Sequence, residues 1–485
     1  MVFSSPIFLF LFLPLTLLFY YANFKRLRNP TLLVASLIFY GWGEPKFLFF
    51  IVFSCVSNYS FSRSINKAHR NASRHQAKIW LGAAVFFNIG ALAFFKYADF
   101  ICANLNMILT GLKIPVLPLP ATGLPLGISF FTFQALSYVV DVYRKEVPSQ
   151  KDPLKLISYI ILFPQLIAGP IVRYHDVAKQ LDERESTTGR FYYGVRRFIF
   201  GLSKKVIIAN NVGFVADYVF GIPVMELTLP MAWLGVFAYT LQIYFDFSGY
   251  SDMAIGLGRM FGFEFLENFN YPYISRTIRE FWQRWHISLS TWFRDYLYIP
   301  LGGNRGSPGA TYRNLLIVFF LCGLWHGASW NFVLWGLYHG FFLALERGMW
   351  GRWVRRAWRP LQHLYVLFVV MAGWVLFRSE SISSAANYFL KMFDFAHSFG
   401  PLYDIQAVAA MNFKIAAAFG CLAVMPLGGF RDLWSEKIGR MRPLPNLVLS
   451  GGSVLMEWAC LFTLFFISAA FLSDDVYNPF IYFRF

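Results

Sequence analysis

The chain has little charge. Asp, Glu, Lys and Arg make up 14% of its 485 residues, whereas soluble globular proteins carry roughly 25%. Hydrophobic residues make up 57%, and the mean hydropathy is +0.48. One or two membrane spans do not raise the average of so long a chain this far. The composition therefore predicts a polytopic, all-α membrane protein with about nine to eleven helical passes of roughly 20 residues each.

Cysteines and standard catalytic motifs are also scarce. The chain has five cysteines, none in a CxxC pair and most in apolar stretches, at Cys55, Cys102, Cys322, Cys421 and Cys460. We therefore predict buried thiols, with neither a disulfide framework nor a zinc or other metal site. No Walker loop, HExxH or GxSxG sequence occurs. No internal repeat or linker divides the chain, so we predict one integral domain over residues 1–485.

Basic residues exceed acidic ones, and the net charge is +17. They cluster in short segments between apolar runs, at residues 25–28, 70–78, 196–205 and 347–356. This is the positive-inside pattern, so we expect these segments to be cytoplasmic loops that contact the membrane lipid. Part of the excess can attract an anionic ligand. A nucleic-acid partner is not predicted.

Several apolar runs are interrupted. The run 31–61 breaks at residues 41–45, and the run 156–172 is interrupted by Pro164. The run 314–345 would be roughly 48 Å long as a straight helix, which exceeds the ~30 Å hydrocarbon core. Broken helices inside a bilayer need protein or water around their freed backbone groups. The breaks therefore predict a cavity within the bundle.

His326 lies inside the run 314–345, between Gly323 and Gly327. The two glycines can supply the break and let another backbone or a substrate approach closely. An ionisable residue at membrane depth is a functional hypothesis by default. A histidine among aromatic residues is also often a satisfied core residue. From the residues alone, a structural role, a metal ligand and a catalytic base all stay open.

The stretch 276–298 combines aromatic and charged residues. Its apolar residues recur at helical spacing, at Phe281, Trp285, Leu289, Trp292 and Tyr296. A second face carries the polar residues Arg279, Gln283, His286, Ser290 and Arg294. We predict one amphipathic helix, which either lies in the membrane interface with snorkelling arginines or lines a wet cavity for an anionic substrate. Another polar island, residues 244–258, holds Asp246 and Asp252, which could border a cavity; we favour ion pairs with basic residues that hold helices together.

Four segments in one order carry a family resemblance. They are "FPQLIAGPIVRY" (163–174), "YFDFSGYSDMAIGLG" (244–258), "PYISRTIREFWQRWHISLSTWFRDYLYIPLGGNRG" (272–306) and "NLLIVFFLCGLWHGASWNFVLWGLYHG" (314–340). Together they resemble the membrane-bound O-acyltransferase family, most closely its alginate O-acetyltransferase branch in bacterial exopolysaccharide acetylation. The resemblance implies a multi-pass fold with broken and re-entrant helices around a central tunnel.

The resemblance also implies a site. It assigns the essential histidine inside the membrane to His326 and a second polar position, further upstream, to His286. Acetyl transfer needs a base, and histidine suits that role near neutral pH. We expect both rings within about 10 Å of one another because both must reach one carbonyl, on a tunnel open to the cytoplasmic side. The expected donor is acetyl-CoA, with Arg279 and Arg294 holding its phosphates, and no metal.

The same resemblance places the chain in the bacterial inner membrane. It implies that the acetyl group is relayed to a periplasmic SGNH-like acetyltransferase within a polysaccharide export machinery. Two other classes stay open on the residues. A secondary transporter of a small anion would suit broken helices and a midplane histidine, although the paired halves usual in transporters are missing. A scaffold subunit of an export complex would keep its function without His326.

Overall fold

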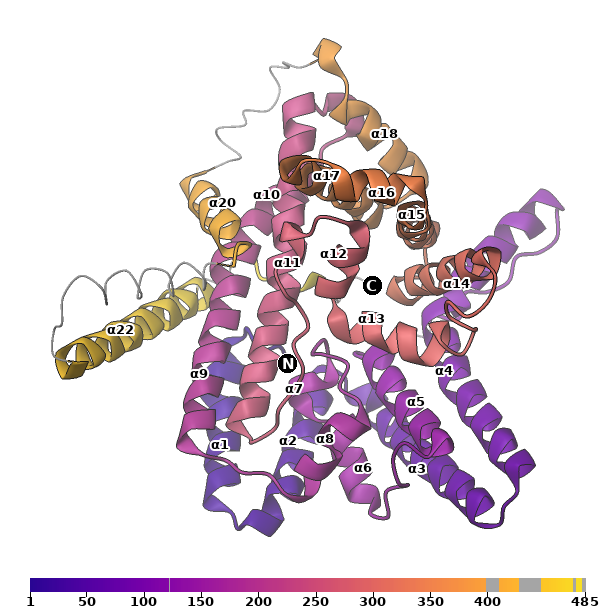
Figure 1. Ribbon diagram of the computed structural model, residues 1–485, viewed down its shortest axis with the longest axis vertical. Helices are drawn as coiled ribbons and strands as arrows, with labels where there is room; N and C mark the ends of the chain where they lie inside the picture. Colours follow the sequence, from indigo (N-terminus) through magenta and orange to yellow (C-terminus); the bar gives the residue numbers. More distant parts are fainter. Residues whose placement is uncertain (122, 398–409, 427–445, 474–476, 482–485) are drawn as a thin grey trace.

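The computed structural model describes residues 1–121, 123–397, 410–426, 446–473 and 477–481 (Figure 1). All regular structure in these ranges is helical, so the predicted all-α class is confirmed. Five helices are long and apolar enough to cross a membrane, namely Pro45–Arg70, Arg74–Gly111, Thr188–Phe220, Arg359–Arg378 and Val454–Ser473. Large apolar side chains on two of them are exposed, with Phe86 81% and Phe462 70% accessible. Such surfaces suit lipid, whereas the full number of spans stays a prediction.

The N-terminal third forms a group of helices at one end of the molecule (Figure 1). It comprises the π-helix η1 (Phe8–Phe12) and helices α1 (Leu13–Ala22), α2 (Arg28–Gly43), α3 (Leu48–Arg70), α4 (Arg74–Gly111) and α5 (Ile128–Arg144). Helices α2 and α3 are separated at Glu44–Phe47, which confirms the predicted break. The ends of α2 and α3 at this break therefore lie opposite the basic ends at Arg28 and Arg70.

The middle of the chain holds two long helical units that pack along each other. Its elements are α6 (Pro153–Ile160), α7 (Phe163–Leu166), α8 (Tyr174–Asp182), α9 (Thr188–Ser203), the π-helix η4 (Lys204–Ala209), α10 (Asn210–Phe220) and α11 (Leu229–Met260). Figure 1 shows α9 beside α11. The contact relies on glycine, because a Cβ at Gly201 would lie 2.6 Å from the carbonyl oxygen of Gly249. Small residues let helix backbones meet this closely.

Residues 196–205, predicted as a cytoplasmic loop, are helical instead. They belong to α9 and the start of η4, and three of their four cations pair with α11, whereas Arg196 pairs with Glu457 of the helix Asn446–Ser473. Lys204 lies 2.6 Å from Asp252, and Lys205 lies 2.6 Å from Asp246. The pairing predicted for both aspartates is therefore confirmed. Buried charges need such partners, which is why this basic segment is packed between helices and not in water.

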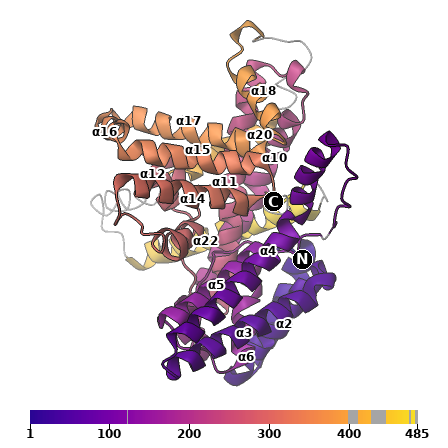
Figure 2. The same cartoon turned by 90° about the vertical axis from the view of Figure 1, so that its right-hand side faces the viewer.

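The C-terminal half carries the histidines of the candidate site. It comprises α12 (Ile278–Arg284), α13 (Ile287–Phe293), the π-helix η7 (Arg294–Tyr298), α14 (Pro308–His326), α15 (Trp330–Arg347), α16 (Met349–Arg356), α17 (Arg359–Arg378), α18 (Ile382–Met392), α20 (Met411–Ala423) and α22 (Asn446–Ser473). In Figure 2, α14, α15 and α17 lie side by side, and α14–α15 and α15–α17 are in contact. All five cysteines are free. Cys55 and Cys322 are buried as predicted, but Cys421 and Cys460 are exposed on helices α20 and α22.

Candidate active site

His326 is the last residue of α14. Gly327 follows in an extended conformation, and α15 begins at Trp330 after an N-cap at Ser329. The predicted break in the run 314–345 is therefore confirmed. A Cβ at Gly327 would lie 2.3 Å from the ring of Phe332, so only glycine lets α15 fold back this tightly. The break leaves His326 5% exposed at the point where two helices meet.

The carbonyl groups at the end of α14 all accept hydrogen bonds. The Gly323 carbonyl accepts from the backbone of Gly327 at 3.4 Å. The carbonyls of residues 324–326 accept from two adjacent side chains of α4. The Tyr97 hydroxyl donates to the carbonyl of Leu324. The Lys96 ammonium donates to the carbonyls of Trp325 and His326, at 3.1 Å in the case of His326. A cation at a helix C-terminus also interacts favourably with the helix dipole.

The ring of His326 is held by aromatic side chains. Its centroid lies 4.9 Å from the rings of Trp325 and Trp335 and 5.2 Å from that of Phe377, edge to face in each case. Among the residues that the structure describes, none bonds to its buried Nδ1 atom. Packing therefore fixes the plane of the ring, and no protein group in these ranges occupies that nitrogen.

His326 lines a cavity of 590 Å³ together with Trp325 and Lys96. The remaining wall comes from the N-terminal residues, from residues 42–44 around the end of α2, from residues 124–130 before and within α5, and from Ile167. Residues 42–44 are at the C-terminal end of α2, whereas the basic residue Arg28 begins the helix at its other end. If the basic segments are cytoplasmic, this cavity lies toward the other side of the membrane. A tunnel that opens to the cytoplasmic side stays a prediction.

His286 breaks the stretch 276–298, which we predicted as one helix. The residue has φ of +43° and separates α12 from α13, and η7 continues after Phe293. Left-handed backbone at a residue other than glycine costs about 1–3 kcal/mol and needs support from its surroundings. Asn268 gives that support, because its carbonyl accepts from the Ile287 backbone at 2.9 Å. The predicted apolar face is buried except for the half-buried Tyr296. On the predicted polar face, His286 is buried whereas Arg279 and Arg294 are exposed.

The hydrogen bonds of Asn268 define the state of the His286 ring. The Oδ1 atom of Asn268 accepts a hydrogen bond from the Ser288 backbone N–H at 3.2 Å, which fixes the side-chain amide with its oxygen on this side. The same oxygen lies 3.1 Å from Nδ1 of His286. Because an amide oxygen only accepts, Nδ1 carries the proton and Nε2 keeps its lone pair in the neutral ring. Asn268 lies in the segment before α12, and no pattern in the sequence linked it to His286.

The two histidines contact the same indole. The ring centroid of Trp325 lies 4.9 Å from that of His326 and 6.0 Å from that of His286. His286 is 1% exposed and is not part of the wall of the cavity that His326 lines. The structure therefore brings the two residues into one aromatic cluster, but it does not place both on this cavity as we predicted.

A third histidine in this cluster escaped the sequence analysis. His339 on α15 is fully buried, and its ring lies 5.2 Å from Trp282 and 5.1 Å from Trp335. Within the described ranges neither of its ring nitrogens has a hydrogen-bond partner. Its only sequence signal was its place in the same apolar run as His326. Across the same ranges, no group of three His, Cys, Asp or Glu side chains has the arrangement of a metal site.

The two predicted donor-binding arginines lie apart from this cluster. Arg279 and Arg294 are exposed, and neither belongs to the wall of the His326 cavity. Arg294 pairs with Asp295 at 2.6 Å, and Asp295 also pairs with Arg173 at 2.8 Å. The charge that we expected to attract an anion is thus partly compensated within the protein.

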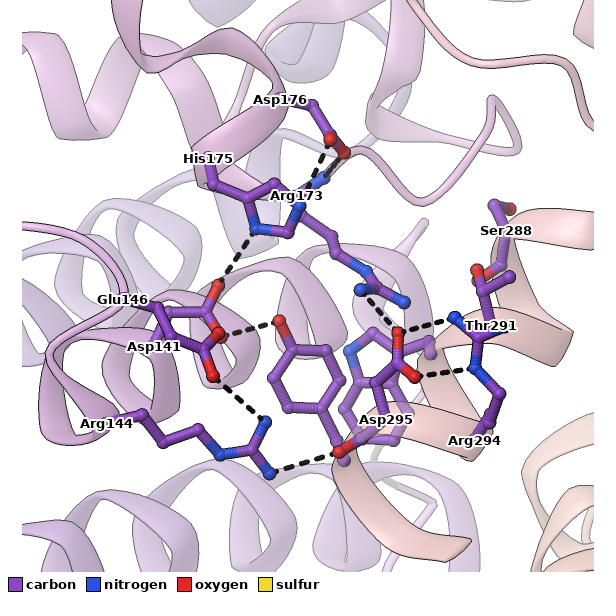
Figure 3. A network of polar contacts seen from close by, with 12 residues as sticks. Asp141, Arg144, Glu146, Arg173, His175, Asp176, Ser288, Thr291, Arg294 and Asp295 are labelled. Atoms are coloured by element: carbon purple, nitrogen blue, oxygen red, sulfur yellow. Dashed lines mark hydrogen bonds and ion pairs between the residues drawn. The ribbon is translucent and has the colours of Figure 1, made fainter. Parts of the chain in front are cut away.

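Asp295 and its partners belong to a polar network between α5, α8 and η7 (Figure 3). His175 lies within it, with Nδ1 3.4 Å from Asp141 and Nε2 3.1 Å from Asp176. Tyr296 donates to Asp141 at 2.7 Å. The hydrogen bond to Asp141 and then that to Asp176 raise the pKa of His175 from 6.5 to about 10. Both ring nitrogens are therefore protonated at neutral pH, and the imidazolium holds α8 against α5.

This network predicts a pH dependence of stability. A histidine whose pKa is raised on folding stabilises the protein fully below its unfolded value of 6.5. That contribution is lost as the pH rises toward about 10. We expect the thermal midpoint of the wild type to fall more between pH 7 and pH 10 than that of His175→Gln. His69→Gln, at the end of α3, serves as the control. Parallel pH curves for wild type and His175→Gln would show that the imidazolium is not needed.

The chain is helical, and two buried histidines lie at helix breaks, one of which, His326, lines a cavity. The model of the membrane-bound O-acyltransferase family matches residues 47–384. The chain belongs to this family and is an acyltransferase. It is 40% identical to the probable alginate O-acetylase AlgI of Azotobacter vinelandii, with all of both chains covered.

More distant relatives act on other cell-surface polymers. The chain is 37% identical to the peptidoglycan O-acetyltransferase of Helicobacter pylori, over 79% of this chain and 78% of that protein. It is 29% identical to the teichoic acid D-alanyltransferase of Bacillus subtilis, over 45% of this chain and 58% of that protein. The enzyme class thus replaces the transporter and the scaffold that the residues alone left open.

Proposed function

We propose that this protein moves an acetyl group from cytoplasmic acetyl-CoA across the bacterial inner membrane, for O-acetylation of an exported polysaccharide. The polymer is alginate or a similar glycan such as cellulose. The names of the AlgI relatives support the polymer and the acetyl group. The observation that carries the proposal is His326, which ends a broken helix and lines a cavity beside Lys96.

In this mechanism His326 is the general base. It takes the proton of the acceptor hydroxyl while the hydroxyl oxygen forms a bond to the acetyl carbonyl carbon. The bond between that carbon and the thioester sulfur then breaks, and the proton passes to the departing thiolate. The products are the acetyl ester and free CoA. The aromatic contacts and the Lys96 bonds would keep the ring in place, as a base within hydrogen-bond reach requires.

His286 is the second proposed catalytic residue. Its bond to Asn268 leaves Nε2 as an acceptor, so the ring can orient a hydroxyl or a water near the thioester. Its contact with Trp325 couples its position to that of the His326 segment. In this proposal His326, at the end of α14, is the base, and His286, at the start of α13, orients the reacting group.

The acceptor side of the reaction needs other proteins. We propose that the acetyl group passes to a periplasmic SGNH-like acetyltransferase that belongs to the export machinery of the polymer. The position of the His326 cavity, opposite the basic ends of α2 and α3, supports delivery on that side. Expression of the chain in cells that lack their own copy should restore O-acetyl groups on the exported polymer. Polymer that stays unacetylated despite normal membrane abundance would contradict the proposal.

The role of Arg294 in holding the donor phosphates can be tested through its partner. If Arg294 binds the donor, Arg294→Ala should weaken acetyl-CoA binding about tenfold to a hundredfold, as expected for a lost charge-assisted hydrogen bond. Asp295→Asn should strengthen binding, because it removes the carboxylate that lies 2.6 Å from the guanidinium. Arg279→Ala tests the second arginine, and equilibrium binding of labelled acetyl-CoA is the measurement. Unchanged affinity in all three variants would leave the arginines as interfacial side chains.

A further inference from the structure

A second cavity lies where α2 begins, at the basic end of the N-terminal helices. Its volume is 590 Å³, and we call it the Arg28 cavity. Its wall carries four cationic side chains, Lys25, Arg28, Arg184 and Arg190. The wall includes no residue of the histidine cluster. The Arg28 cavity is therefore separate from the candidate active site.

Carboxylates also line the Arg28 cavity, but they do not neutralise its cations. Asp182 pairs with Lys155, and Glu264 pairs with Arg259, and neither of these two cations belongs to the wall. The other two, Glu183 and Glu185, are exposed. Within the described ranges, no carboxylate lies within 4 Å of a charged nitrogen of Lys25, Arg28 or Arg184. The wall thus holds as many carboxylates as cations, but two of the four carboxylates are paired with cations outside it, and Lys25, Arg28 and Arg184 keep no ion pair within the described ranges.

Two of these guanidinium groups meet at one ring. Arg28 and Arg184 lie 5.1 Å and 5.6 Å from the ring centroid of Tyr20. Arg184 donates only to neutral oxygens, including Asn29 Oδ1 at 2.6 Å. The side chain of Arg28 has no hydrogen bond or ion pair in the part of the chain that the structure describes. Two cations held this close are stabilised by an anion with several acceptor oxygens, and phosphate has that chemistry.

An apolar groove runs from the same segment along the outside of α1 and α2. Its volume is 560 Å³, and we call it the α1–α2 groove. It is lined by side chains such as Leu15, Phe19, Val34 and Ile38, and one end lies at Leu27, next to Arg28 in the chain. The 16 residues of α2 make about 24 Å of helix, more than one leaflet of the ~30 Å hydrocarbon core. Figure 1 shows the two helices side by side.

We propose that this surface binds an anionic phospholipid, with its phosphate in the Arg28 cavity and an acyl chain in the α1–α2 groove. The cationic end and the apolar length match the two halves of such a lipid. The basic residues of this end predict the cytoplasmic leaflet, where anionic lipids attract cationic side chains. The proposal uses none of the histidines of the aromatic cluster, although Met1, Ile7 and Trp42 at the far end of the groove also line the His326 cavity.

The headgroup contact is tested by native mass spectrometry of the purified full-length protein, titrated with phosphatidylglycerol or with phosphatidylcholine of equal chain length. Arg28→Gln should weaken phosphatidylglycerol binding about tenfold and leave phosphatidylcholine unchanged. Arg26→Gln, in the same segment but outside the cavity wall, is the matched control and should behave as wild type. Because the Arg28 side chain donates to no described protein atom, we expect Arg28→Gln to fold, and a thermal midpoint near that of the wild type checks this.

The acyl-chain contact has its own variants. Val34 is 56% exposed and lines the groove, so Val34→Trp should fill it and weaken binding of long-chain phosphatidylglycerol. Binding of dihexanoyl phosphatidylglycerol should be unaffected. Leu18→Trp, at a residue 62% exposed and outside the groove, is the control. Equal phosphatidylglycerol affinity in wild type and Arg28→Gln would overturn the proposal. Displacement of the lipid by adenosine 3′,5′-bisphosphate would also overturn it, and assign the cavity to a nucleotide phosphate.

Discussion

His326→Gln should abolish acetylation of the exported polymer. Glutamine keeps a hydrogen-bonding group in the same aromatic pocket but cannot take a proton, so only the basicity is lost. General base catalysis contributes about a hundredfold to ten-thousandfold, and we expect a loss of that size. The measurement is the O-acetyl content of polymer from cells that carry only the variant, normalised to the amount of protein in the membrane.

A matched control separates basicity from burial. His339→Gln changes another fully buried histidine of the same cluster, which does not line the cavity. We expect it to keep most of the activity. The role of His326 as base would be contradicted by near-wild-type acetylation from a stable His326→Gln protein. Equal losses in both variants would point to packing of the cluster as the cause.

Lys96→Met should lower activity about a hundredfold, because it releases the end of the helix that carries His326. The ammonium donates to the carbonyls of Trp325 and His326, and methionine cannot replace either bond. Each buried carbonyl left without a donor costs about 1–3 kcal/mol. A shift of about 1 Å in a catalytic group can cost about a hundredfold in rate. The initial rate of acetyl transfer and the thermal midpoint should be measured together.

Three variants define the origin of that loss. Lys96→Arg keeps the charge and several donors, so it should recover part of the activity. Tyr97→Phe removes one bond to the same helix end and should have a smaller effect than Lys96→Met. Lys78→Met, at an exposed position of α4, should match wild type. If Lys96→Met lowers the midpoint but not the rate of the folded protein, Lys96 supports the fold alone.

Much of the fold could be predicted from apolar length and helix breakers. The breaks near Glu44 and after His326 follow from glycine, proline and runs too long for one bilayer. Asp246 and Asp252 were expected to find cations because buried carboxylates need them. Their partners, Lys205 and Lys204, were interpreted as part of a loop, however, because the ion pairs join positions far apart along the chain.

The details of the site could not be predicted, because they depend on contacts remote in sequence. The helical spacing of residues 276–298 continues through His286, and only the hydrogen bond from the Ile287 backbone to the Asn268 carbonyl shows why the backbone turns there. Lys96 was visible as a lysine in an apolar run. Its partners, at the far end of α14, belong to a different part of the chain, which no local pattern reveals. The orientation of the cavity likewise depends on how α2, α5 and α14 meet.

The central claim is that the acetyl group crosses the membrane through the site at His326. Proteoliposomes in which the basic loops face outward test it most directly. Labelled acetyl-CoA is added outside, and a soluble glycan acceptor with the periplasmic acetyltransferase is enclosed inside. The account predicts labelled acetyl ester inside vesicles with wild-type protein, and only background with His326→Gln. Equal labelling by both proteins, or ester formed only on the outer side, would contradict it.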